Sequence, residues 1–348
     1  MNDSIKSSFS TGPAEKRRAS RNRTLTISEA EAAGLEKRLL RVMAPLSIGA
    51  IENRTICGDS TAVAAFLPRG FADLLFLDPP YNLNKSFNGH AFRELPSAEY
   101  RALFESWLAK FVPLLKPTAS VYICGDWRSS GAIQAGAEKH LHVRNRITWE
   151  REKGRGAKSN WKNCAEDIWF CTVSEEFFFN AEAVKVKRRV IAPYTDDAGQ
   201  PKDWERTEGG DFRLTSPSNL WTDITVPFWS MPENTDHPTQ KPEKLLAKII
   251  LASTQEGGLV FDPFLGSGTT SVVAKKLGRR FVGIEQDLTY CALAEKRLCL
   301  ADADKTIQGY SHGIFWERNS DPHASGRTTG RGPDDSPRLA LFASRHDA

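Results

Sequence analysis

The sequence lacks an apolar run long enough to cross a membrane, and its first residues lack the pattern of a secretory signal. A spanning helix needs about 18 consecutive apolar residues, and polar or charged residues interrupt every apolar run of this chain before that length. The opening stretch, MNDSIKSSFSTG, has no apolar core of the kind that a signal peptide requires. These absences predict a cytoplasmic protein.

The cysteines form neither a metal-site pattern nor a disulfide framework. No Cys-x-x-Cys pair occurs, and no cysteine clusters with histidine. Structural zinc sites and small disulfide-rich domains depend on such spacings. We therefore expect no bound metal, and we expect the reduced thiols that are typical of a reducing compartment at Cys57, Cys124, Cys164, Cys171, Cys291 and Cys299.

The chain also contains no internal repeat and no Gly-Lys-Ser or Gly-Lys-Thr motif. The first absence excludes the repeat architectures. The second excludes the P-loop that binds nucleoside triphosphates.

The chain has 348 residues, of which 40% are hydrophobic, so a sizeable core can form. The formal net charge of +4 is only mildly basic and says little about partners. Residues 1–45 are polar and basic, and we expect them to be disordered apart from a short helix that begins after Ser28. Residues 319–348, rich in Gly, Ser, Pro, Asp and Arg, are predicted to form a disordered tail. Residues 46–318 would form the folded domain.

Strands and helices are predicted to alternate within that domain. Short apolar runs predict strands at residues 54–59, 72–78, 120–126, 144–151, 166–173, 258–264 and 279–285. Helical spacing of apolar residues predicts helices at 97–116 with Ser97 as cap, at 241–254, at 269–278 and at 288–301. Such alternation is typical of an α/β fold with a doubly wound, mostly parallel sheet.

Acidic residues stand at the carboxyl ends of the predicted strands. Ligands of doubly wound sheets bind beyond these ends. Any one acid there could simply form a turn, but five of them indicate a functional edge of the sheet: Asp59, Asp78, Asp126, Asp262 and Glu285.

The stretch VFDPFLGSGTTSVV leads from a predicted strand through a glycine turn into a helix. Gly266 and Gly268 allow a close approach of the backbone to a ligand, and the helix start offers free N–H groups to an anion. Glu285, 17 residues after Gly268, stands where an acid binds the ribose of a nucleotide cofactor. The third glycine of the dinucleotide fingerprint is replaced by Ser271, so the turn alone is weak evidence for a nicotinamide-dependent oxidoreductase.

Residues 150–235 form a basic region. Between Arg144 and Lys162 the chain has seven basic residues and two acidic ones, interleaved with Trp149 and Trp161. This composition suits phosphate contacts and base stacking, and it equally suits a solvated loop. We predict that the nucleic-acid contacts are made by Arg151, Lys153, Arg155, Lys158, Lys162, Arg188 and Arg189.

Four stretches together resemble the S-adenosylmethionine-dependent amino-methyltransferases of DNA. They are LDPPY at 77–81, HPTQKPEKLLAKIIL at 237–251, FDPFLGSGTT at 261–270 and GIEQDLTYCALAEKRL at 283–298. The catalytic motif precedes the cofactor motif, which is the permuted order of the β class. The resemblance covers about residues 54 to 300 and implies a Rossmann-like fold in which 150–235 recognises the DNA target.

The resemblance implies a role for each residue of the DPPY stretch. Asp78 and the carbonyl of Pro79 would accept the two hydrogens of an exocyclic amine, and Pro79 and Pro80 would hold these acceptors rigidly. Tyr81 would stack on a base that is swung out of duplex DNA.

The resemblance also implies a set of contacts with S-adenosylmethionine. Asp59 would bind its adenine and Glu285 its ribose. The methionine part would contact Asp262, Pro263, Phe264, Gly266, Gly268 and Thr269. Thr239, Gln240 and Lys241 would close the site. One departure concerns the His-Glu pair of many relatives, which reads Ala-Glu here, so the role of Glu166 stays open.

The acceptor atom follows from family association alone. An aspartate at the first position of the tetrapeptide goes with adenine N6 more often than with cytosine N4. Cytosine C5 is disfavoured because the sequence has no Pro-Cys pair. A catalytically inactive DNA-binding protein and an enzyme acting on RNA or on protein glutamine are further alternatives. Duplex DNA is the expected partner, and a homodimer and a partner endonuclease of a restriction-modification system are left open.

Overall fold

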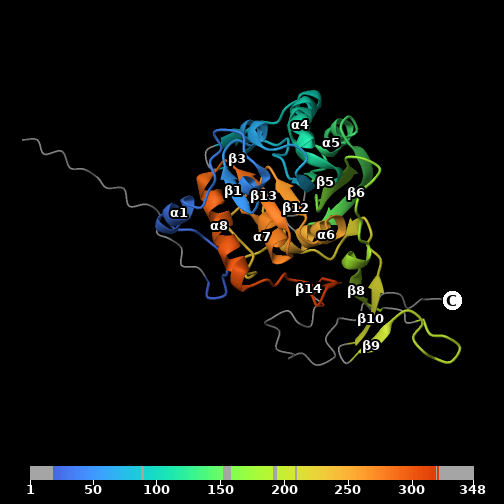
Figure 1. The fold of residues 1–348 in the computed structure, drawn as a ribbon. Helices are drawn as coiled ribbons and strands as arrows, with labels where there is room; N and C mark the ends of the chain where they lie inside the picture. The colour runs from blue at the N-terminus through green and yellow to red at the C-terminus, as the bar shows by residue number, and fades with distance from the viewer. Residues whose placement is uncertain are drawn as a thin grey trace, which may run out of the picture.

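A central sheet organises the molecule in the computed structural model, which describes residues 19–87, 90–151, 158–190, 194–207, 210–318 and 320 (Figure 1). Its eight strands lie in the order β1-β13-β12-β2-β5-β7-β6-β11. Neighbours among the first five strands are parallel, and β7 runs antiparallel to both β5 and β6. The predicted mostly parallel α/β sheet is confirmed. The strands are β1 (Arg54–Cys57), β2 (Ala72–Leu77), β5 (Leu115–Gly125), β6 (His142–Glu150), β7 (Ala165–Thr172), β11 (Leu220–Trp221), β12 (Leu259–Asp262) and β13 (Arg280–Glu285).

The sheet separates two hydrophobic cores. Side chains of a strand alternate between faces, and in β2 Leu75 and Leu77 face one core whereas Leu74 and Phe76 face the other. The first core is closed by α4 (Ser97–Phe111) and α5 (Ser130–Ala137), and the second by α6 (Glu243–Ser253) and α7 (Thr269–Lys276). This two-sided burial explains why the strand reads as a continuous apolar run.

The predicted long helices are present, but the first one differs at both ends. It ends at Phe111 rather than at Lys116, because a 3-10 turn with Pro113 follows at 112–114 and β5 begins at Leu115. Helix α4 begins at Ser97, but its N-cap is Pro96, and no side-chain hydrogen bond caps the helix. Pro96 has φ of −51° and ψ of 143°, so it is the non-helical residue before the helix. Ser97 is therefore the first residue of the first turn and not the cap. The other predicted helices correspond to α6, to α7 and to α8 (Leu288–Ala303). Short helices α2 (Ile48–Ile51) and α3 (Ser60–Val63) flank β1.

A second, five-stranded sheet combines the basic region with the C-terminal part of the domain. Its order is β14-β15-β8-β10-β9, and it lies to one side of the central sheet (Figure 1). Strands β8 (Val186–Arg189), β9 (Glu205–Thr207) and β10 (Gly210–Thr215) come from the predicted recognition region. Strands β14 (Tyr310–Ser311) and β15 (Ile314–Trp316) follow α8, and β15 pairs with β8. A small hairpin, β3 (Lys85–Phe87) and β4 (His90–Phe92), follows the DPPY stretch.

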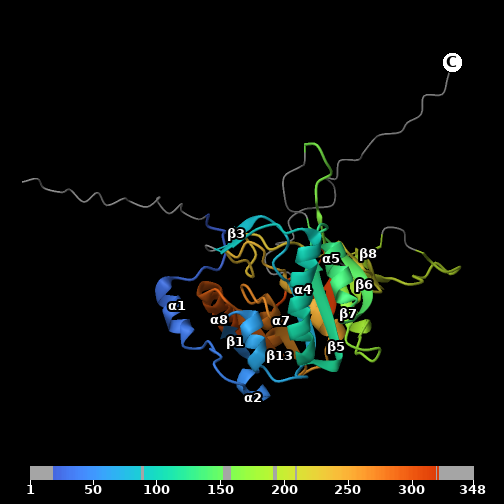
Figure 2. The same cartoon turned by 90° about the horizontal axis from the view of Figure 1, so that it is seen from above.

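The described part of the N-terminal segment is attached to the domain. The expected helix is α1 (Glu29–Glu36), capped by Ser28 and Glu31, and it packs beside α8 (Figures 1 and 2). Leu25 pairs with Thr235, and Leu40 pairs with Ile56 in β1. Packing therefore begins well before residue 46, where the sequence placed the start of the folded domain. The rest of the predicted disordered ends, residues 1–18, 319 and 321–348, lies outside the described residues. Among the helices that the structure describes, none has the length and apolar character needed to cross a membrane.

Candidate active site

A cavity of about 310 Å³ opens at the carboxyl ends of β1, β2, β12 and β13. All five strand-end acids named from the sequence stand at this edge of the sheet, with Asp126 after the parallel strand β5, and three of them, Asp59, Asp78 and Glu285, line the cavity itself. Its wall contains most of the predicted site: Asp59, Asp78, Pro79, Pro80, Tyr81, Thr239, Lys241, Pro263, Phe264, Gly266 and Glu285. It also contains residues to which the sequence analysis gave no role, among them Trp107, His237, Gln286, Asp287 and Tyr290.

The glycine turn after β12 shapes one wall of the cavity. Gly266 has a left-handed backbone with φ of 55°, and a Cβ there would lie 2.9 Å from Nε2 of His237. Its N–H donates to Oε2 of Glu285 at 2.9 Å, and the N–H of Asp287 donates to Oε1 at 2.8 Å. Burial raises the pKa of Glu285. The turn thus fixes a carboxylate at the cavity wall, where its remaining lone pairs suit the hydroxyls of a ribose.

Four residues predicted to contact the cofactor lie behind the wall instead. Asp262 is buried and accepts a hydrogen bond from the N–H of Phe264 at 2.9 Å, and burial raises its pKa to about 7. Oγ1 of Thr269 accepts from Arg297 at 2.9 Å. Gln240 bonds the backbone of Thr235 and Glu233, and Gly268 packs against α8. The hydrogen bonds and packing of these residues hold the loops that form the wall, and their predicted contacts with the cofactor stay predictions.

The DPPY stretch ends in a buried cluster of charges. Nζ of Lys241 lies 2.7 Å from Oδ2 of Asp78 and 2.9 Å from Oε1 of Glu166. The hydroxyl of Tyr81 shares its single hydrogen between Oε1 of Glu166 at 2.5 Å and Oδ1 of Asp78 at 3.0 Å. Nη1 of Arg151 binds the other oxygen of Glu166 at 2.7 Å. Two carboxylates are therefore balanced by two cations in a site where unpaired charges would be costly.

Lys241 lines the cavity, as its predicted place near the cofactor requires, and it also makes contacts that the sequence analysis did not expect. It precedes Pro242, the N-cap of α6, and its side chain is 7% exposed and directed at Asp78. The physical reason is that Asp78 and Glu166 converge in a buried place and need a cation between them. Glu166 was not assigned as a site residue. Two signals in the sequence point to it: it is an acid at the start of a buried strand, AEDIWFC, and it stands in the place of the His-Glu pair of many relatives.

A sequence profile of the DNA methylase family matches residues 72–296 of this chain. The chain belongs to the DNA methylase family. The DNA adenine methyltransferase YhdJ of Escherichia coli (strain K12) is 33% identical over 268 residues, which cover 74% of this chain and 86% of YhdJ. The type II methyltransferase M.HpaI of Haemophilus parainfluenzae is 31% identical over 251 residues, covering 71% of this chain and 74% of M.HpaI.

The fold of this DNA methylase is also similar to a solved one. The structure of the PvuII DNA methyltransferase (cytosine-N4-specific) matches with a TM-score of 0.51 and 17% identity, over 72% of this chain and 92% of that chain. At this identity the similarity concerns the fold alone.

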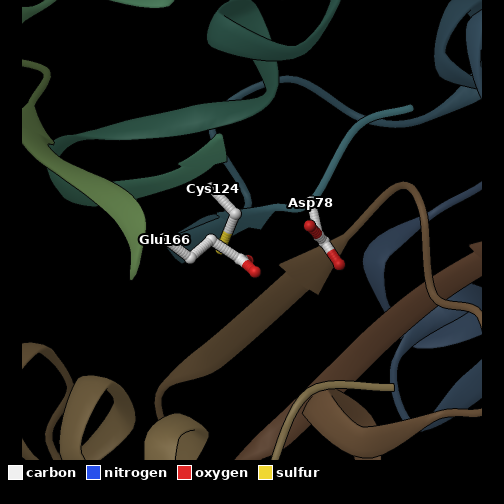
Figure 3. Close-up of side chains that lie close together, drawn as sticks. All are labelled: Asp78, Cys124 and Glu166. Carbon is white, nitrogen blue, oxygen red and sulfur yellow. The ribbon is translucent and has the colours of Figure 1, made fainter. Parts of the chain in front are cut away.

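Figure 3 shows a third side chain beside Asp78 and Glu166, the two acids of the charge cluster. Cys124 at the end of β5 converges with Asp78 and Glu166, and their ligand atoms lie within 4.8 Å of one another. Burial raises the pKa of Cys124 well above its usual value, which favours the neutral thiol. A metal ion here would have to displace Lys241, which already binds both carboxylates.

Aromatic rings form two further parts of the cavity wall. Phe264 meets Trp107 edge to face, with ring centroids 5.4 Å apart. His237 packs edge to face against Tyr290 at 4.5 Å, and burial lowers the pKa of His237 to about 4. His237 is therefore uncharged at neutral pH. This wall can surround an apolar or aromatic part of a ligand without adding charge.

The predicted DNA contacts that the structure describes fall into three groups. Lys158 and Lys162 are exposed in the loop before β7, on either side of Trp161, which is 93% exposed. Arg188 and Arg189 lie on β8 of the second sheet. Arg151 differs, because its guanidinium binds Glu166 rather than facing only solvent. Two others, Lys153 and Arg155, lie outside the described residues.

Proposed function

We propose that this methylase is a site-specific DNA methyltransferase that transfers a methyl group from S-adenosylmethionine to the exocyclic N6 of adenine in duplex DNA. The observation that carries the proposal is that Asp78 and Pro79 share one cavity with Gly266 and Glu285. Acceptors for an amine and a cradle for a nucleoside cofactor thus face the same space. The name of the relative YhdJ supports adenine as the base.

The cavity suits the cofactor on observations of its own. The carboxylate of Glu285 is held by two backbone N–H groups and suits a ribose. Asp59 lines the same cavity at the end of β1, where it caps α3 and accepts hydrogen bonds from Ala62 and Thr61. The uncharged aromatic wall leaves room for a sulfonium, whose methyl group is the electrophile that S-adenosylmethionine supplies. Phe264 would add cation–π attraction to that charge.

Asp78 can accept a hydrogen from the target amine while keeping its present partners. Each oxygen of an ionised carboxylate has two lone pairs. Tyr81 uses one on Oδ1 and Lys241 one on Oδ2, so one remains on each oxygen. The lone pair of an aromatic amine is delocalised into the ring, and hydrogen bonds from its N–H groups favour the localised form that attacks the methyl group.

The turn after Asp78 is fixed by a bond from another element. The hydroxyl of Tyr100 in α4 donates to the carbonyl of Pro80 at 3.1 Å. With two prolines and this bond, the carbonyl of Pro79 is held as the second acceptor before the base arrives. A base inside a duplex cannot reach a recessed cavity, so the target base has to leave the stack and lie against Tyr81.

Methylation of DNA by the purified protein tests this function. Plasmid DNA is incubated with S-adenosylmethionine, digested, and analysed by nucleoside mass spectrometry. N6-methyladenine is the expected product. N4-methylcytosine alone would change the base and leave the chemistry standing, and no methylated nucleoside would overturn the proposal. Asp78→Ala should abolish transfer while cofactor affinity, measured by calorimetry, stays within about threefold, since Asp78 faces the amine rather than the ribose.

Three finer proposals go with this function. The enzyme would act in the cytoplasm, as a homodimer, with a partner endonuclease of a restriction-modification system. Light scattering of the purified protein tests the dimer, and challenge of methylated and unmethylated DNA with lysate of the source cell tests the endonuclease.

A further inference from the structure

Glu166 is the most buried member of the charge cluster and does not line the cavity. Its side chain is 2% exposed, against 7% for Lys241 and 18% for Asp78. It comes from β7, whereas Asp78 follows β2. A group in this place cannot touch the substrate, so any effect on the reaction has to pass through its partners.

Those partners are the two groups that hold Asp78. Nζ of Lys241 donates to Oε1 of Glu166 and to Oδ2 of Asp78, and the single hydrogen of Tyr81 is shared between Oε1 of Glu166 and Oδ1 of Asp78. Lys241 and Tyr81 therefore bridge an outer and an inner carboxylate. Without the outer one, the flexible Lys241 side chain would lose the contact that fixes its direction.

We propose that Glu166 is a positioning residue for methyl transfer, which holds Lys241 and Tyr81 so that they fix the carboxylate of Asp78 in the orientation that accepts the target amine. This inference rests on the proposed function. Arg151 completes the arrangement by binding Oε2, which leaves Oε1 to Lys241 and Tyr81. Three contacts in series, Arg151 with Glu166, Glu166 with Lys241 and Lys241 with Asp78, connect the beginning of the basic region to the catalytic aspartate.

The same contacts give the proposal a signed pH effect. Burial raises the pKa of Asp78, Lys241 lowers it, and Glu166 raises it again. Asp78 has to be ionised to accept the amine, so activity falls as pH falls through its pKa. Removing the charge of Glu166 lowers that pKa and extends activity to lower pH. Removing the charge of Lys241 raises it and shifts the loss of activity to higher pH.

Other groups near Asp78 do not reverse these signs. Tyr81, Tyr100 of α4 and Cys124 of β5 have raised pKa values and stay neutral. Asp262 of β12 interacts with Asp78, and burial raises its pKa to about 7. Asp262 is present in every variant compared, so its titration is part of the pH profile of each of them.

The experiment measures kcat, KM for DNA and the dependence of kcat on pH. The fall of kcat towards low pH is called the acid limb. Glu166→Gln should lower kcat roughly 10- to 100-fold through a misplaced acceptor, with KM nearly unchanged and the acid limb at lower pH. Lys241→Gln should move the limb to higher pH. Glu166→Asp, which restores the charge, should return the limb to its wild-type position. The matched control is Glu175→Gln, which removes the charge of an exposed acid that pairs with Arg144 and His142 beyond the other end of β7, and it should change nothing.

The outcomes separate the two proposals. A wild-type protein that methylates no DNA overturns the proposed function. An active wild type whose acid limb is unmoved by both Glu166→Gln and Lys241→Gln overturns this inference alone, even where kcat falls, because a purely structural role predicts that result. Should thermal unfolding show that Glu166→Gln does not fold, Arg151→Gln replaces it, because the side chain of Arg151 is 33% exposed. That change leaves Glu166 less compensated and should move the limb to higher pH, and an unmoved limb overturns the inference.

Discussion

Gly268→Ala should destabilise the protein strongly, because the glycine serves packing rather than ligand binding. Gly268 is the N-cap of α7 and has a left-handed backbone with φ of 86°. A Cβ on this residue would lie 2.6 Å from Cβ and 2.9 Å from Cα of Ala294 in α8. The obstacle includes the backbone of a buried helix, which cannot turn aside as the end of a side chain could.

The size of the effect follows from two contributions. A left-handed conformation costs a residue with a Cβ about 1–2 kcal/mol. Forcing extra atoms into a packed interior adds about 1–3 kcal/mol. The sum of about 2–5 kcal/mol is a large part of the roughly 5–15 kcal/mol by which a typical domain is stable.

Gly257→Ala is the matched control for this prediction. Gly257 also has a left-handed backbone, with φ of 73°, but an added Cβ would meet nothing within 4 Å. Only the first contribution of about 1–2 kcal/mol applies to it. Urea unfolding followed by tryptophan fluorescence measures both variants. If Gly268→Ala unfolds at the same urea concentration as Gly257→Ala, the contact with Ala294 does not limit the residue at position 268, and the packing role of Gly268 is refuted.

Three further predictions concern the cofactor, the N-terminal segment and the DNA. Glu285→Ala should weaken S-adenosylmethionine binding by about 1–3 kcal/mol in calorimetry, the size of a lost hydrogen bond to a charged group, and unchanged affinity would remove it from the site. Deleting residues 1–18 should leave thermal stability intact, whereas deleting 1–26 removes the pairing of Leu25 with the loop before α6 and should lower it; equal stability would contradict this. Arg189→Gln should reduce the salt slope of DNA binding by about one, and an unchanged slope would make Arg189 ordinary surface charge.

The sequence predicted the central sheet and its functional edge because the signals for them are local. The apolar run of β2 ends in Asp78, and the glycine turn follows β12 directly, so each can be read from a few neighbouring residues. The carboxyl ends of parallel strands meet at one edge whatever the strand order. The acids at the ends of β1, β2 and β13 could therefore be placed at one cavity before their neighbours in the sheet were known.

The second sheet could not be predicted in the same way. Its strands contain two to six residues, too few for a clear alternation of apolar and polar side chains. Strand β8 reads VKRR, which indicates a charged surface as readily as a strand. Its pairing with β15 joins parts of the chain more than a hundred residues apart along the sequence. The basic composition of β8 was visible, but its partner was not.

The charge cluster depends on the direction of a single strand. Strand β5 lies between β2 and β7, and its end residue Gly125 pairs with Asp167 near the start of β7. Because β7 runs antiparallel, its first residues lie at the edge where β2 and β5 end, and Glu166 arrives beside Asp78. Had β7 been parallel, its start would lie at the opposite edge, and the buried aspartate would have faced Lys241 alone. Two acids brought together in this way require a cation, and Lys241 supplies it. This contact depends on the direction of β7, and no local pattern in the sequence encodes that direction.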